Sequence, residues 1–174
     1  KLFTQWNRVA PEFTSMHEMR GDIPAECGLL MAGTFISDHI AALHQTHSYS
    51  AWCVEADYLP VYQYHKTVLQ ILQWHNPRQR WLLKAPEHQV HLDTLLQVYP
   101  DARIVQTHRD PIKPVGSSCD NLRFFMEQKN RDIDLALIGA NISEQLLAAA
   151  NRMMQARDEN PQVPFHDIHY RRFV

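Results

Sequence analysis

Two short apolar runs in this chain each end in a polar segment that carries a cation. Trp81-Leu82-Leu83 comes directly before Lys84, and residues 102–106 lead into Thr107-His108-Arg109. Runs of this length between turn signals are typical of buried strands. Between and after them, apolar residues recur at helical spacing. Strands that alternate with helices indicate βαβ units, so we predict an α/β protein whose parallel sheet is flanked by helices.

The same patterns predict the individual elements along the chain. Helices are expected over residues 22–44 and 58–74, from Pro86 to about residue 99, from Pro111 onward, and over residues 132–159. Residues 1–21 are expected to be irregular with at most one short helical turn, and residues 46–50 are expected to form a loop. Strands are expected at residues 80–84, 102–107 and 165–170. Three strands make a thin sheet, so we expect further strands to lie outside this chain.

Cationic and hydroxyl side chains follow the first two predicted strands. Ligands of open α/β sheets bind outside the carboxyl ends of the strands, which is where Lys84 and Arg109 are expected. Ser117 and Ser118 belong to the helix that follows Arg109. Cations and hydroxyls at the start of a helix are suited to an anion, so this edge is predicted to bind a phosphate- or sulfate-bearing ligand.

Composition narrows the class of protein. The 174 residues suit one α/β domain over residues 1–174, and a net charge of -2 gives no general attraction for nucleic acid. No apolar run approaches membrane-spanning length, and the first residues lack the apolar core of a signal peptide. Cys27, Cys53 and Cys119 are too widely spaced for a disulfide framework or a zinc site, which indicates a reducing, cytoplasmic location.

Two other motif readings are weaker. His88 and His91 are three positions apart, but the H-E-x-x-H pattern of a zinc helix is absent, so no metal is expected. The triplet His108-Arg109-Asp110 also occurs in the catalytic loop of protein kinases. That loop needs an asparagine five residues after the aspartate, where this chain has Val115.

Taken together, three segments closely resemble the bacterial-type sulfotransferase family. They are RWLLKAPEHQVHLD at residues 80–93, YPDARIV at 99–105 and THRDP at 107–111. The likeness covers about residues 20–125, and residues 163–172 more weakly. It implies a three-layer, P-loop NTPase-like parallel sheet flanked by helices. It also implies transfer of a sulfonate group from 3'-phosphoadenosine 5'-phosphosulfate (PAPS) to a hydroxyl on a small molecule or glycan.

The resemblance also implies roles for particular residues. Arg109 and Ser117 would hold the 3'-phosphate of the donor, with Ser118 as the alternative hydroxyl. Lys84 would lie beside the transferred group, where a cation stabilises charge on the leaving phosphate. His88 is the candidate general base, because an unperturbed imidazole titrates near neutral pH. Glu87 and His91 are the alternatives for that role.

One expected part of such an enzyme is absent from this sequence. The family's glycine- and serine-rich loop for the 5'-phosphosulfate has no counterpart here, and the five glycines do not cluster. We therefore expect these residues to be the interior of a longer protein whose α/β fold is incomplete in this chain. The competing hypotheses are another P-loop transferase, such as a small-molecule kinase, and a non-catalytic sulfotransferase-like remnant. The sequence identifies neither the acceptor nor the oligomeric state.

Overall fold

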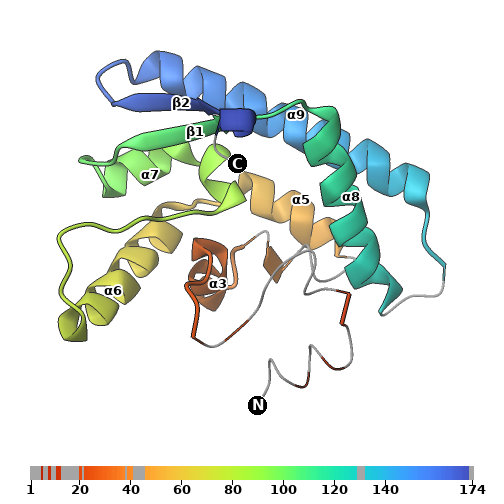
Figure 1. The fold of residues 1–174 in the computed structure, drawn as a ribbon, viewed down its shortest axis with the longest axis horizontal. Coiled ribbons are helices and arrows are strands. Elements are labelled where there is room, and N and C mark those ends of the chain that lie inside the picture. Colours follow the sequence, from red (N-terminus) through yellow and green to blue (C-terminus); the bar gives the residue numbers. More distant parts are fainter. Residues whose placement is uncertain are drawn as a thin grey trace.

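The computed structural model describes residues 5, 8, 11, 12, 20, 22–37, 39–40, 46–128 and 132–172. In chain order, the elements are α3 (Cys27–Met31), η1 (Ala32–Thr34), α5 (His47–Glu55), α6 (Leu59–His75), η2 (Pro86–Gln89), α7 (Leu92–Val98), β1 (Ile104–His108), α8 (Ile112–Glu127), α9 (Leu135–Glu159), β2 (Phe165–His169) and η3 (Tyr170–Arg172). A small sheet lies at one side of the molecule, next to α7 and α9 (Figure 1).

The sheet consists of β1 and β2, which pair in parallel from Ile104 opposite Phe165 to His108 opposite His169. The chain passes from one strand to the other through α8 and α9, as a parallel pair requires. Alternate residues of β1 are half-buried, whereas Val105 between them is 57% exposed. An α/β fold with a parallel sheet flanked by helices is therefore confirmed.

The core lies where α6, η2 and α7 pack against α3 and the carboxyl-terminal half of α9. Met31, Val61 and Tyr62 have no accessible surface, and Met153 of α9 is 4% exposed. The buried apolar cluster comprises Cys27, Met31, Tyr58, Val61, Tyr62, Ala85, Leu92, Leu95, Leu96, Val98, Met153 and Ala156. Ala85 belongs to this cluster and joins Lys84 to η2, which carries Glu87 and His88.

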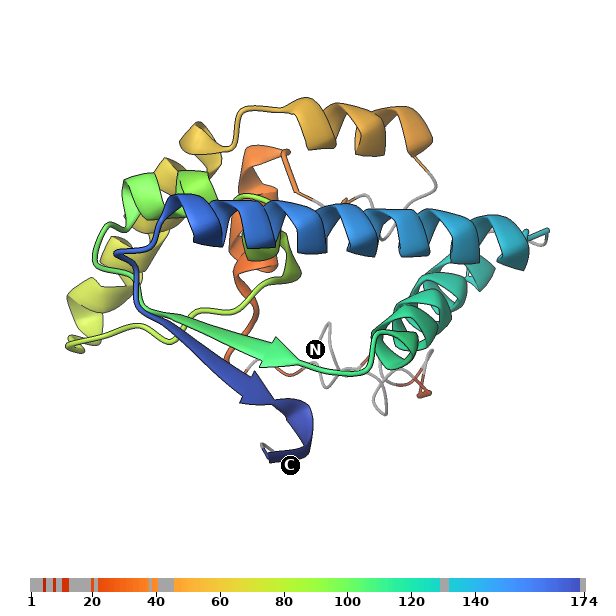
Figure 2. The ribbon, with the colours of Figure 1, turned by 90° about the horizontal axis from the view of Figure 1, so that it is seen from above.

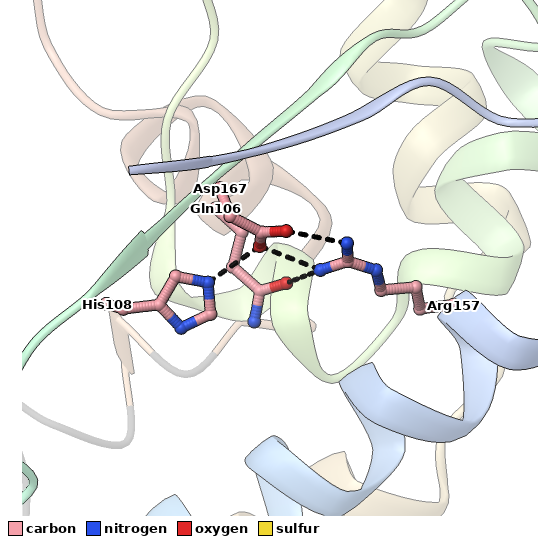
Figure 3. A network of polar contacts seen from close by, with 4 residues as sticks. All are labelled: Gln106, His108, Arg157 and Asp167. Carbon is pink, nitrogen blue, oxygen red and sulfur yellow. Dashed lines mark hydrogen bonds and ion pairs between the residues drawn. The ribbon is translucent and has the colours of Figure 1, made fainter. Parts of the chain in front are cut away.

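A polar network fastens α9 to the sheet (Figure 3). Arg157 of α9 donates from both terminal nitrogens to Asp167 of β2, at 2.8 and 2.7 Å, and donates to Gln106 of β1 at 3.2 Å. His108 Nε2 lies 2.7 Å from the same aspartate. The adjacent Arg157 and His108 lower the pKa of Asp167. These contacts fix the carboxyl end of β1, from which Arg109 follows.

The predicted strand at residues 80–84 is wrong, because this segment is extended but makes no sheet ladder with another described strand. Leu82 is 97% exposed and Trp81 is 43% exposed, so the apolar run is not buried between neighbours here. The carbonyl of Lys84 instead accepts a hydrogen bond from the Cys27 N–H at 3.0 Å. A strand is defined by its backbone partner, and an apolar run cannot supply one by itself.

The predicted loop at residues 46–50 is also wrong, since α5 starts at His47. Tertiary contacts favour the helix over the loop. Tyr49 donates its hydroxyl to the Phe35 carbonyl at 2.9 Å, and Cys53, one turn later, is fully buried. Polar, turn-forming residues at 46–50 are compatible with the first turn of a helix once these contacts exist.

The predicted helix over residues 22–44 is much shorter in the structure. Among the described residues it is divided into α3 and η1, which end at Phe35, and a helical stretch that appears again at residues 39–40; the φ of Phe35, 58°, lies in the left-handed region. Thr34 closes this end by donating its hydroxyl to the Met31 carbonyl at 2.8 Å. The last predicted residues, 41–44, lie outside the described residues, as does most of the segment 1–21, for which an irregular structure was predicted; residues 5 and 8 of that segment are helical.

Most of the remaining helices agree with their predictions. α6 and α9 match the expected ranges to within a few residues. The helix predicted from Pro86 to about residue 99 is divided instead, into η2 at Pro86–Gln89 and α7 at Leu92–Val98, which ends before Pro100. Pro114 is the third residue of α8, where a backbone N–H has no helical partner, so the proline interrupts nothing. Among the described helices, including the 25-residue α9, none is both long and apolar enough to cross a membrane.

Candidate functional site

Lys84 lies at the end of the extended segment that leads into η2. Its side chain is 70% exposed, and its ammonium forms an ion pair with the carboxylate of Glu26. Glu26 is the residue before α3, and the next residue, Cys27, bonds the Lys84 carbonyl. Lys84 is therefore held at both its backbone and its side chain by one short segment, although it belongs to no strand.

Arg109 follows the last residue of β1 and is exposed. Its guanidinium carbon lies 4.5 Å from the centroid of the Tyr170 ring, a cation–π distance. Tyr170 follows β2, and the register opposes His108 to His169, so the next residues along the two strands meet. The planar guanidinium is thereby supported at the carboxyl end of the sheet, with hydrogen-bond donors available for an anion.

Ser117 and Ser118 are the sixth and seventh residues of α8, and not in its first turn. Ser117 is exposed and Ser118 is half-buried. Only the first four N–H groups of a helix lack internal partners, so these serines offer their hydroxyls to a ligand and not their backbone N–H groups. Ser117 lies two turns beyond Arg109, which starts the connection into the same helix.

His88 is half-buried beside α6, with its Nδ1 atom 2.9 Å from the Tyr62 hydroxyl. Burial, assisted by the charge of Glu87, raises the pKa of Tyr62, so that hydroxyl stays protonated and donates. Burial is the main cause that lowers the pKa of His88 to about 4, and the nearby His65 adds to the effect. Neutral His88 therefore accepts at Nδ1 and carries its hydrogen on Nε2, which is buried without a hydrogen-bond partner. Acting as a base at Nδ1 would require the Tyr62 hydroxyl to move away.

The two alternatives to His88 occupy different environments. Glu87 is 3% exposed and accepts a 2.6 Å hydrogen bond from the Ser37 hydroxyl. A Cβ atom on Gly28 would lie 2.8 Å from the Glu87 carboxylate, so a glycine is needed for this close approach. His91 is stacked on Tyr58 with 3.4 Å between ring centroids, and burial lowers its pKa to about 4.

Removing the Tyr62 hydroxyl tests the importance of this buried pair. Tyr62→Phe should reduce the free energy of unfolding by about 1–3 kcal/mol, because both ring nitrogens of His88 would then be buried without partners. Urea unfolding measures the loss. Tyr64→Phe is the matched control on the same helix, since Tyr64 is 42% exposed, and should change stability by less than about 0.5 kcal/mol. Equal effects of the two substitutions would contradict the assignment.

Lys84 and Arg109 lie at the ends of two backbone segments that run in the same direction. The extended segment before η2 and strand β1 cross the molecule the same way in both views (Figures 1 and 2). Lys84 lies at the carboxyl end of the extended segment, and Arg109 comes directly after the carboxyl end of β1. Their contacts differ, because Lys84 pairs with Glu26 whereas Arg109 stacks on Tyr170. Whether both cations and Ser117 bind one ligand stays a prediction.

Two of the contacting residues were not predicted from the sequence. Tyr170 was assigned only to a strand; the parallel register alone would have placed it beside Arg109. Glu26 was assigned only to the first turn of a helix. It lies 58 positions from Lys84, and no local pattern connects the two residues.

The described residues contain no group of three or more histidine, cysteine, aspartate or glutamate side chains that could hold a metal ion. The three cysteines are free thiols; Cys27 and Cys53 are buried and Cys119 is half-buried.

Comparison with known proteins identifies the family. The profile described as "Sulfotransferase family" matches residues 1–174. The chain belongs to the sulfotransferase family. A crystal structure of sulfotransferase STF1 from Mycobacterium tuberculosis H37Rv is similar to it, with 31% sequence identity and a TM-score of 0.87. A search of curated proteins finds no match.

The match covers very different shares of the two chains. The match covers 98% of this chain but 47% of the mycobacterial one. The sulfotransferase fold is therefore shared along nearly all of the residues described here, and the chain spans just under half the length of that relative. The resemblance that the sequence predicted from residues 80–111 is confirmed at the level of family and fold.

Proposed function

We propose that this chain contributes donor-binding and catalytic residues to a PAPS-dependent sulfotransferase. The observation that carries the proposal is the family match over residues 1–174, together with cations at the carboxyl ends of two segments that run in the same direction. The family match favours sulfonate transfer over the kinase that the sequence left open. The acceptor would be a hydroxyl on a small molecule or glycan, and the three free thiols fit the cytoplasmic location predicted from the cysteines.

The proposed roles follow from charge and exposure. Arg109 would bind the 3'-phosphate with its planar donors, and the hydroxyl of Ser117, or of Ser118, would add a hydrogen bond. Lys84 would stabilise negative charge on the leaving phosphate as the sulfur–oxygen bond breaks. A general base would take the proton of the acceptor hydroxyl as its oxygen forms the new bond to sulfur. His88 is our candidate, with Glu87 and His91 as the alternatives.

Binding of adenosine 3',5'-bisphosphate (PAP) tests the proposal without knowledge of the acceptor. Calorimetry on the full-length protein should detect PAP binding, and Arg109→Ala should weaken it by roughly 10- to 150-fold. This range corresponds to the loss of about 1.5–3 kcal/mol from a charge-assisted contact.

Arg103→Ala is the matched control, because Arg103 is also exposed but precedes β1, whereas Arg109 follows it. This control should stay within about twofold of the unmodified protein. Unchanged affinity in Arg109→Ala would refute the phosphate assignment. A protein that binds no PAP at all would support the non-catalytic alternative.

A further inference from the structure

Glu26, the residue before α3, contacts Lys84, the candidate catalytic lysine. Glu26 occupies the N-cap position of α3, yet its side chain makes no capping hydrogen bond. Its carboxylate pairs with the Lys84 ammonium, and the neighbouring Cys27 N–H donates to the Lys84 carbonyl at 3.0 Å. Cys27 is 3% exposed and belongs to the buried core. The carboxylate is thus presented from a part of the backbone that is itself held by packing.

Lys84 needs such a contact more than a lysine on a strand would. The extended segment that carries it has no ladder with another described strand, and its side chain is 70% exposed. A lysine side chain has a flexible four-carbon stem, and an exposed one samples many positions. Catalysis by a cation at a leaving group depends on its position, and a displacement of about 1 Å can cost up to about 100-fold in rate.

We propose that Glu26 is a positioning residue that holds the Lys84 ammonium in place for sulfonate transfer. This inference rests on the proposed function. Glu26 touches neither donor nor acceptor in this role and acts only through Lys84. Its negative charge also lies near the proposed binding site of an anionic nucleotide. Removing the charge should therefore favour nucleotide binding while it slows transfer, a combination that a loss of folding cannot produce.

The ion pair is unsuited to a purely structural role. The Lys84 side chain is 70% exposed and that of Glu26 is 29% exposed. Pairs that are open to water add little to stability. α3 retains its buried residues Cys27 and Met31 whatever occupies position 26. Variants at Glu26 are therefore expected to fold, and an unchanged melting temperature establishes this for each of them.

The rate of PAPS cleavage provides the first test, with water as the acceptor and released [35S]sulfate as the signal. At saturating PAPS, Glu26→Ala should cleave at least about tenfold more slowly than the unmodified protein, and Glu26→Gln should be intermediate. PAP affinity, from calorimetry, should be equal or tighter in both variants. Asp22→Asn is the control. It removes the same charge four positions away, from an exposed ion pair with Arg20, and should leave rate and affinity unchanged.

A double-mutant cycle provides the second test. If Glu26 acts only through Lys84, then Glu26→Ala should have less than about a twofold effect on cleavage in a Lys84→Ala background. An equal effect in both backgrounds would overturn the inference, as would a normal rate in Glu26→Ala or PAP affinity that falls together with the rate. A protein that neither binds PAP nor cleaves PAPS would overturn the proposed function itself, so the two failures are distinguishable.

Discussion

Replacing Lys84 with alanine should slow PAPS cleavage by roughly 10²- to 10³-fold. A preorganised group that stabilises charge only as it develops contributes about this much to the rate of a transfer reaction. Lys84 is exposed, and its ammonium is held by Glu26, so it is available to an incoming donor. Because the effect is confined to the transition state, PAP affinity should fall much less than the rate.

Two further variants make the Lys84 experiment specific. Lys84→Arg keeps a positive charge but replaces the compact ammonium by a planar guanidinium, so its rate should lie between those of the alanine variant and the unmodified protein. Arg80→Ala removes a cation from the same extended segment, four positions earlier, and should change the rate by less than about twofold. Rates are measured by release of [35S]sulfate at saturating PAPS. Equal losses in Arg80→Ala and Lys84→Ala would contradict a specific role for Lys84.

Lowering the pH from 7 to 5 should reduce the free energy of unfolding by roughly 3–4 kcal/mol through His88 and His91 together. Burial is the main reason that the pKa of each imidazole is about 4 in the folded protein. The nearby His65 adds to the effect at His88, and the charge of Arg152 adds to it at His91. In the unfolded chain, a histidine titrates near 6.5.

The direction of the pH effect follows from these values. Between about pH 6.5 and 4, the unfolded chain binds protons at both positions, whereas the folded protein does not, so stability falls as the pH falls. Above pH 6.5, both states are neutral at these positions, and their contribution is constant. Burial also lowers the pKa of His65, which adds to the loss in the same direction.

Urea unfolding at constant ionic strength, followed by tryptophan fluorescence at pH 8, 7, 6 and 5, measures this dependence. His91→Gln should remove about half of the loss between pH 7 and 5, because one of the two imidazoles with a lowered pKa is gone. Between pH 8 and 7, the unmodified protein should change little. Stability that is constant down to pH 5, or a full loss in His91→Gln, would show that these histidines are not held neutral by burial.

Most of the helices could be predicted because their information is local. In α6, apolar residues recur on one face, and Asn76-Pro77 follows its end, so both its range and its stop are readable from adjacent residues. The parallel orientation of β1 and β2 followed from the alternation of strands and helices, whereas the structure decided that these two strands pair. The segment at residues 80–84 shows where this reasoning fails, since its composition suits a strand but no described strand pairs with it.

The candidate site, too, could be predicted from the sequence only in part. The sequence alone determined that Lys84 and Arg109 each end an extended run and that the chain resembles sulfotransferases, because both features are patterns of neighbouring residues. Only the tertiary structure decided that Glu26 holds Lys84, that Tyr170 supports Arg109, and that the half-buried His88 contacts the Tyr62 hydroxyl. Each of these contacts joins residues far apart along the chain. Contacts of this kind depend on how whole elements pack, and no short sequence window records that packing.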